Sequence, residues 1–189
     1  AVLILAFTAF SWLAMQAVHE GGHALGAALT GGKVAKVILH PFVVSRTDVE
    51  PNPHPLFVVW AGPVVGSALP LLAYLLALRL RAPGAYLFRF YAGFCLIVNG
   101  VYIGGAAIRG LADAGDMIRH GSPRWTCFLF GLCTAPRGLY LWHRLGAHFG
   151  LVPGAAGWDP RYDIDRNGYV GMADYSMFAS IYGSSYAYG

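Results

Sequence analysis

Residues 1–29 have the sequence AVLILAFTAFSWLAMQAVHEGGHALGAAL, an apolar run longer than the roughly 20 residues that a membrane-crossing helix needs. The run contains one strongly polar cluster, His19-Glu20-Gly21-Gly22-His23. Ionisable side chains are costly inside a membrane and usually have a function there. This stretch therefore predicts a membrane helix with a functional site in its C-terminal half.

Three further apolar segments cover residues 55–80, 85–108 and 125–151, and Pro136 and Arg137 interrupt the last of them. Hydrophobic residues make up 57% of the 189-residue chain and charged residues 12%, against about 45–50% and about 25% in ordinary soluble domains. The sequence therefore predicts an all-α polytopic membrane protein with about four transmembrane helices.

A small β insertion is predicted between the first two helices. Residues 34–39 and 42–44 are β-type runs separated by Pro41, and a proline-rich segment at 50–55 ends the region. Such a pattern is typical of short strands or a hairpin.

The polar cluster of the first helix has the HExxH pattern. Residues four apart share one face of a helix, so His19 and His23 can bind a single zinc ion. Glu20 is next to them and can take a proton from a zinc-bound water, whose pKa the metal lowers towards neutrality. A chance pentapeptide is the alternative. The apolar setting favours Zn²⁺ and predicts a zinc metalloendopeptidase with Glu20 as general base and acid.

Zinc needs a third protein ligand, for which the candidates are His40, His54, Asp113, Asp116, His120, His143 and His148. The first and third helices run in the same direction, so their C-terminal ends are expected on one side of the membrane. This topology brings Asp113 and Asp116 beside the histidines. The alternatives are a helix N-cap at Asp113 and a solvated first-turn charge at Asp116.

These motifs resemble those of the site-2 protease family, the intramembrane zinc metalloproteases. Residues 19–23 match the family's helical HExxH, and Gly62-Pro63 resembles the Gly-Pro element of its next helix. Residues 112–117 resemble its Leu-Asp-Gly-Gly-x-Ile element, which implies Asp113 rather than Asp116 as the third zinc ligand. The resemblance covers about residues 1–125 and is that of a divergent compact member. It implies that Asn99 contacts substrate; a buried amide that bridges two helices is the alternative for this residue.

The resemblance implies an endopeptidase that hydrolyses peptide bonds of membrane-embedded or membrane-adjacent substrates. An extended substrate could pair with the sheet edge at residues 34–39 by β-augmentation; a hairpin that only plugs the cavity is the alternative. A hypothesis of another class is a non-catalytic membrane subunit or scaffold with a structural metal site, closed by His40, His54 or His120 as fourth ligand.

Residues 163–174 follow the twelve-residue calcium-loop pattern. The predicted Ca²⁺ ligands are the side chains of Asp163, Asp165, Asn167 and Asp174 and the backbone carbonyl of Tyr169. Aspartate at the last position makes the loop resemble a dockerin-type module. An Asx-rich turn without metal and a flexible tail are the alternatives. The predicted domains are a membrane-embedded zinc metalloprotease-like domain at 1–150, a linker at 151–158 and a calcium-loop tail at 159–189.

Charge and cysteine usage limit the expected partners to a membrane protein or peptide substrate and the lipid bilayer. The net charge of +4 is scattered, without a basic run, so nucleic acid is not expected. The chain has three cysteines, an odd number, and each lies in an apolar stretch. This pattern is typical of free thiols. Basic residues are more numerous on the expected zinc side, which the positive-inside rule places near the cytoplasm, with the tail outside.

Overall fold

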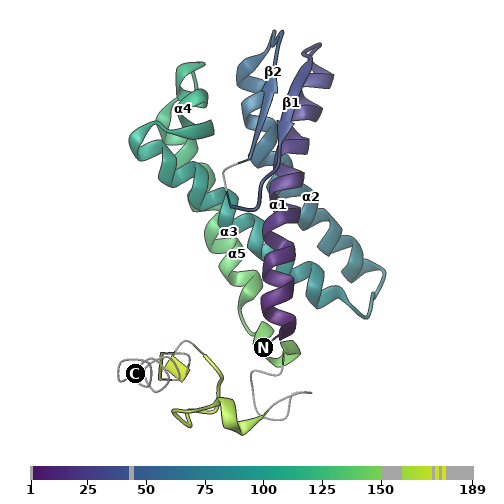
Figure 1. Ribbon diagram of the computed structural model, residues 1–189, viewed down its shortest axis with the longest axis vertical. Helices are drawn as coiled ribbons and strands as arrows, with labels where there is room; N and C mark the ends of the chain where they lie inside the picture. Colours follow the sequence, from purple (N-terminus) through teal and green to yellow (C-terminus); the bar gives the residue numbers. More distant parts are fainter. Residues whose placement is uncertain (1, 43–44, 150–158, 172, 175, 178–189) are drawn as a thin grey trace, which may run out of the picture. The chain divides into compact units, whose positions relative to one another are not determined.

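The computed structural model describes residues 2–42, 45–149, 159–171, 173–174 and 176–177. It is mostly helical and contains a two-stranded antiparallel sheet (Figure 1), which confirms the predicted helical architecture with a small β insertion. The elements divide between two units, residues 1–142 and residues 143–189. The first unit contains, in order, α1 (Val2–Leu29), β1 (Val34–Ile38), β2 (Arg46–Val49), α2 (Pro55–Arg79), α3 (Ala85–Arg109), α4 (Ala112–Arg119) and α5 (Arg124–Trp142).

The second unit contains two short 3₁₀ helices among its described residues, η1 (Leu145–Phe149) and η2 (Pro160–Tyr162). The predicted linker at 151–158 lies outside the described residues. The helix expected to open at Asp174 is described only in part, with helical backbone at residues 173–174 and 176–177.

Two of the described helices, α2 and α3, are long and apolar enough to cross a membrane. Spans through α1 and α5 stay predictions. The fourth helix differs from its expected extent, since α5 ends at Trp142 rather than near residue 151. Pro136 and Arg137, which interrupt the apolar segment, both lie inside α5.

The first unit exposes apolar side chains and buries polar ones. Leu72 of α2 is 61% exposed, and Leu69, Leu75 and Leu76 of the same helix are exposed as well. The buried polar side chains of this unit include Ser11, Gln16, His19, Glu20, His23, Ser67 and Asn99. A water-soluble domain has the opposite distribution. The arrangement therefore fits an apolar surrounding with a polar interior, as a membrane-embedded site requires.

Glycines allow α1 to pack closely against α2. A Cβ on Gly22 would lie 2.5 Å from the Ala61 carbonyl oxygen, and one on Gly26 would lie 2.7 Å from the Ala61 side chain. Small residues serve this purpose where helices meet in membranes. Gly21 is different, because a Cβ there would meet nothing within 4 Å.

The contact between α3 and α5 is also lined with glycine. A Cβ on Gly138 of α5 would lie 2.6 Å from the Gly93 carbonyl oxygen of α3, and one on Gly131 would lie 2.8 Å from that of Gly100. Near one end of this contact, the Trp142 indole donates a hydrogen bond of 2.9 Å to the Phe90 carbonyl oxygen. This packing fixes the position of α3. That helix carries Asn99 and leads into α4, which carries Asp113.

The small sheet pairs β1 with β2, with Val37 opposite Thr47. The second strand is Arg46–Val49, which follows the apolar run predicted at 42–44. Phe42 is 91% exposed in the connection, and residues 43–44 lie outside the described part of the chain. Contacts between β2 and α1, rather than β propensity, select the strand.

A short helix, α4, lies between α3 and α5 in the first unit. Gly110 has a φ of 63°, in the left-handed region where glycine is favoured, and there the chain leaves α3 and turns into α4. The N-cap of α4 is Leu111, so the alternative of Asp113 as N-cap is wrong. Asp113 lies in the first turn, where its side chain is available for other contacts.

The two glycines inside the HExxH motif should respond oppositely to alanine. Gly21→Ala should raise the free energy of unfolding by about 0.5–1 kcal/mol, because helical glycine is unfavourable and the site is open. Gly22→Ala should lower it by about 1–3 kcal/mol, because the methyl group would collide with α2. Thermal unfolding of the purified protein in detergent measures both, and equal shifts for the two variants would contradict this packing.

Candidate metal centre

Two imidazoles and one carboxylate converge at the C-terminal half of α1. His19 Nε2 lies 3.2 Å from His23 Nε2 and 2.9 Å from Asp113 Oδ2, and the His23 Nε2–Asp113 Oδ2 distance is 3.5 Å. The histidines come from successive turns of α1, and the aspartate comes from α4, which follows α3 in the chain. The topology expected from the sequence therefore brings these three residues together.

The three distances fit a tetrahedral metal ion. Zinc–ligand bonds of about 2.0–2.1 Å at tetrahedral angles place neighbouring ligand atoms about 3.4 Å apart. The observed separations of 2.9, 3.2 and 3.5 Å lie close to that value. One nitrogen–nitrogen–oxygen triangle of this size can hold one zinc ion and leave a fourth position free of these side chains.

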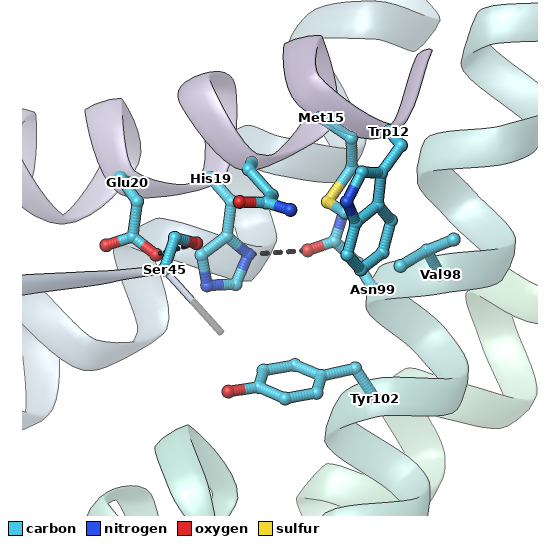
Figure 2. A pocket seen from close by; sticks show the side chains of 9 residues that line it. Trp12, Met15, His19, Glu20, Ser45, Val98, Asn99 and Tyr102 are labelled. Atoms are coloured by element: carbon cyan, nitrogen blue, oxygen red, sulfur yellow. Dashed lines mark hydrogen bonds between the residues drawn. The ribbon is translucent and has the colours of Figure 1, made fainter. Parts of the chain in front are cut away.

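The other nitrogen of each imidazole contacts an acceptor. His19 Nδ1 donates to Asn99 Oδ1 at 2.7 Å (Figure 2), and His23 Nδ1 donates to the Val58 carbonyl oxygen at 2.9 Å. These bonds put the ring proton on Nδ1, so both Nε2 lone pairs point towards Asp113. Neutral imidazoles with the proton on Nδ1 present their Nε2 lone pairs as zinc ligands do, and hydrogen-bonded imidazoles of this kind are typical of zinc sites.

Asn99 is bound at both ends of its amide. Its Oδ1 accepts from His19, and its Nδ2 donates to the Cys95 carbonyl oxygen at 2.9 Å within α3. These contacts join α3 to α1, as the alternative of a helix-bridging amide predicts, and they orient the His19 ring. The predicted contact with substrate stays a prediction.

Asp113 and Asp116 have different surroundings. Burial by itself would raise the pKa of the Asp113 carboxyl, but its contacts with His19 and His23 lower that pKa by more, so the group is ionised as a metal ligand must be. Asp116 pairs with Arg119 on the exposed side of α4. The structure thus brings Asp113, and not Asp116, to the histidines.

Gly62 of α2 makes room for one of the imidazoles. A Cβ at this position would collide with the His23 ring, including its Nε2 atom. The Gly-Pro element noticed in the sequence therefore has a steric reason here, since any side chain at Gly62 would displace a candidate ligand.

Glu20 lies next to the three ligand atoms without joining their triangle. It belongs with His19 and His23 to a cluster of buried groups whose ligand atoms lie within 4.8 Å of one another. Its two carboxylate oxygens accept hydrogen bonds from the hydroxyls of Ser45 and Thr47, each at 2.7 Å. Glu20 is therefore placed for proton transfer beside the ligand triangle.

Two cavities adjoin the cluster, and Glu20 lines both. The first has a volume of about 100 Å³ and lies between α1 and α3, with Trp12, Met15, Val98 and Tyr102 in its wall (Figure 2). The second has a volume of about 250 Å³ and is lined largely by polar side chains, among them Arg46, Asp48, Asp116 and His120. The cluster therefore adjoins one apolar cavity and one polar cavity.

Three other candidate ligands of the first unit, His40, His54 and His120, are exposed. His40 and His54 line neither of the two cavities at the cluster, whereas His120 lines the polar cavity together with His23 and Asp113. His143 and His148 belong to the second unit.

A second cluster of carboxylates occupies the predicted calcium loop. Oxygen atoms of Asp163, Asp165 and Asp174 lie within 4.8 Å of one another. Hydrogen bonds from the N–H groups of Gly171, Asp165 and Ile164 hold the pKa of Asp174 below its ordinary value.

The rest of this loop has Asx-type turns. Asp163 Oδ2 accepts from the Gly168 N–H at 3.0 Å, and Asn167 Oδ1 accepts from the Tyr169 N–H at 2.8 Å. Asp163 Oδ1 is buried without a hydrogen-bond partner. Gly168, at the sixth position of the loop, has the positive φ of 86° that this turn needs. Calcium binding here stays a prediction.

The contrast between the two aspartates of α4 gives a test. Asp113→Ala should weaken zinc binding by at least about 10-fold, because it removes one corner of the triangle, whereas Asp116→Ala should leave the affinity nearly unchanged. Competition with a chromophoric zinc chelator measures both. A larger loss from Asp116→Ala would reverse the assignment.

Comparison with known proteins places the chain in a family. A family model described as Peptidase M50B-like matches residues 2–105, more than half of the 189-residue chain. The match includes α1, the sheet, α2 and most of α3, but it ends before Asp113. No curated protein and no solved structure matches. The match supports the resemblance to site-2 proteases, and the chain belongs to the Peptidase M50B-like family.

Proposed function

We propose that this chain is a zinc-dependent endopeptidase that hydrolyses peptide bonds of membrane-embedded or membrane-adjacent proteins. The observation that carries the proposal is the triangle of His19 Nε2, His23 Nε2 and Asp113 Oδ2, whose sides measure 2.9 to 3.5 Å. Family membership and two apolar helices of membrane-crossing length support a membrane protease. The lipid bilayer and a membrane protein or peptide substrate are its expected partners.

Zinc held by the triangle would acidify an attacking water and polarise the scissile carbonyl group. The two imidazoles supply neutral Nε2 lone pairs, because their Nδ1 protons are engaged by Asn99 and Val58. Glu20 takes the proton of the attacking water and returns it to the leaving amine. The carboxylate is suited to both steps, since it lies beside the triangle without being part of it.

The two cavities support a division of the site between substrate and water. The apolar cavity between α1 and α3 offers few free polar groups, because Asn99 and Glu20 already have partners. It suits an apolar segment of substrate. The polar cavity near His120 suits water and the charged ends of a cleaved chain. Pairing of an extended substrate with the free edge of β1 stays part of this proposal.

The alternative of a structural metal clip is less well supported. A structural zinc site closes its fourth position with a protein ligand, whereas a catalytic site leaves it for water. Of the residues expected to close such a site, His40 and His54 line neither cavity at the cluster, and His120 lines the polar one but is exposed. A buried glutamate beside the triangle is also more useful to a catalyst than to a clip.

A second proposal concerns the loop at residues 163–174, which would bind Ca²⁺. Its oxygen ligands are hard, which suits calcium and poorly suits zinc. The observation that favours it is the gathering of the three aspartates, with Asp163 Oδ1 buried and unpartnered. An apolar core of such a short segment is small, so bound metal would supply much of its stability.

Removal of the base should separate catalysis from metal binding. Glu20→Gln should abolish proteolysis of a membrane substrate while the protein retains its zinc, because Glu20 acts on the proton and not as a ligand. His19→Ala is the matched control and should lose both zinc and activity. Metal analysis and a cleavage assay on the same preparations decide the matter, and an active Glu20→Gln protein would refute the proposed function.

Calcium removal should loosen only the tail. Treatment with EGTA should expose residues 163–174 to protease and leave the helical unit intact, because the three aspartates then repel one another. Asp163→Ala should reproduce this without chelator. Asp159→Ala is the control, since Asp159 pairs with Arg161 outside the loop and its loss should leave the EGTA response unchanged. Equal protection with and without calcium would contradict the calcium proposal.

A further inference from the structure

The sheet supplies two hydroxyl groups to the carboxylate of Glu20. Ser45 Oγ donates to Oε1 at 2.7 Å, and Thr47 Oγ1 donates to Oε2 at 2.7 Å. Thr47 also lies 3.3 Å from the Glu20 carbonyl oxygen, so it contacts both the side chain and the backbone. The glutamate is 3% exposed, and both of its oxygens are thus engaged by one strand segment.

The alternation of β structure explains why both hydroxyls face α1. Ser45 and Thr47 are two residues apart and therefore lie on one face of the extended chain. Arg46 and Asp48 lie on the other face, where they form an exposed ion pair with an Arg46 Nε–Asp48 Oδ1 distance of 3.4 Å. Pairing of Thr47 with Val37 of β1 fixes the register. A register shift of one residue would turn the charged side chains of Arg46 and Asp48 towards Glu20 in place of the two hydroxyls.

Neutral donors suit a carboxylate that must accept a proton. Hydrogen bonds to a buried carboxylate offset its desolvation and restrict the rotation of a long side chain. A cation at the same place would hold the carboxylate in a salt bridge and make it a weaker base. In the described part of the chain, no lysine or arginine forms an ion pair with Glu20. Each oxygen retains a lone pair for a further partner.

The connection between the strands is anchored to the same face of α1. Trp12 Nε1 donates to the Pro41 carbonyl oxygen at 2.9 Å, two helical turns before Glu20. Figure 2 shows Trp12, Glu20 and Ser45 around the apolar cavity. Pro41 and Ser45, the described residues on either side of positions 43–44, therefore both contact α1.

We propose that Ser45 and Thr47 are positioning residues, whose hydroxyls hold the Glu20 carboxylate in place for proton transfer beside the metal triangle. This inference rests on the proposed function of Glu20 as the base. It makes the small sheet a part of the active site, and not only a surface on which a substrate could dock.

Isosteric removal of the hydroxyls tests the inference. The Ser45→Ala/Thr47→Val protein should bind zinc as the unchanged protein does, with kcat lowered about 10- to 100-fold, because the Glu20 carboxylate loses both of its hydroxyl donors. The single variant Thr47→Ser keeps the hydroxyl group, so its kcat should equal that of the unchanged protein. Thr30→Val is a matched control, since the Thr30 hydroxyl donates to the Gly26 carbonyl oxygen instead. It should leave kcat unchanged.

A double-mutant cycle on thermal unfolding provides a readout other than activity. Thr47→Val should lower the Tm of the zinc-loaded protein, because it leaves one oxygen of a buried carboxylate without its donor. The same change in a Glu20→Ala background should shift the Tm much less, which measures the coupling between the two residues.

The outcomes distinguish this inference from the proposed function. An unchanged kcat in the Ser45→Ala/Thr47→Val protein, with Glu20→Gln inactive, would overturn the positioning role and leave the protease intact. Equal Tm shifts from Thr47→Val in both backgrounds would also overturn it. An active Glu20→Gln protein would instead refute the function on which the inference rests.

Discussion

The convergence of three electron-pair donors is the constraint on which the rest of the first unit depends. His19, His23 and Asp113 bring their donor atoms within 2.9 to 3.5 Å of one another, an arrangement that a bound cation would stabilise. The surrounding elements satisfy this constraint in different ways. Glycines let α1 approach α2, and the turn at Gly110 redirects the chain so that α4 brings its carboxylate back to α1.

The site also shows how a polar cluster is maintained in an apolar protein. Each buried polar group around the triangle has a partner: Asn99 for His19, the Val58 carbonyl for His23, and two hydroxyls for Glu20. Unpaired groups at this depth would each cost on the order of 1–3 kcal/mol. Because every partner comes from a different element, the cluster couples α1 to α2, α3 and the sheet. The catalytic groups and the packing of the helices therefore depend on one another.

The sequence was sufficient for the parts that periodicity and spacing determine. Apolar segments predicted the positions of α1, α2 and α3, and the HExxH spacing placed His19 and His23 on one helical face. The direction of successive helices was enough to bring Asp113 near them. Four membrane spans were predicted, and two of the described helices have the length and apolarity that this requires.

Other features depend on tertiary contacts that no local pattern records. The polar strand Arg46–Val49 has weak β propensity, and its pairing follows from hydroxyl contacts with Glu20 across 25 and 27 positions of sequence. The bond between Asn99 and His19 joins residues 80 positions apart. A signal for Ser45 and Thr47 was present in the alternation of hydroxyl and charged residues along 45–48, but only the structure shows which face meets α1.

X-ray absorption at the zinc edge of the purified protein tests the central claim most directly. The account predicts one zinc ion per chain, with two imidazole nitrogens and oxygen ligands from one carboxylate and solvent, and loss of the signal in His19→Ala. A metal-free protein, or zinc with a third imidazole or a thiolate in its coordination sphere, would contradict it.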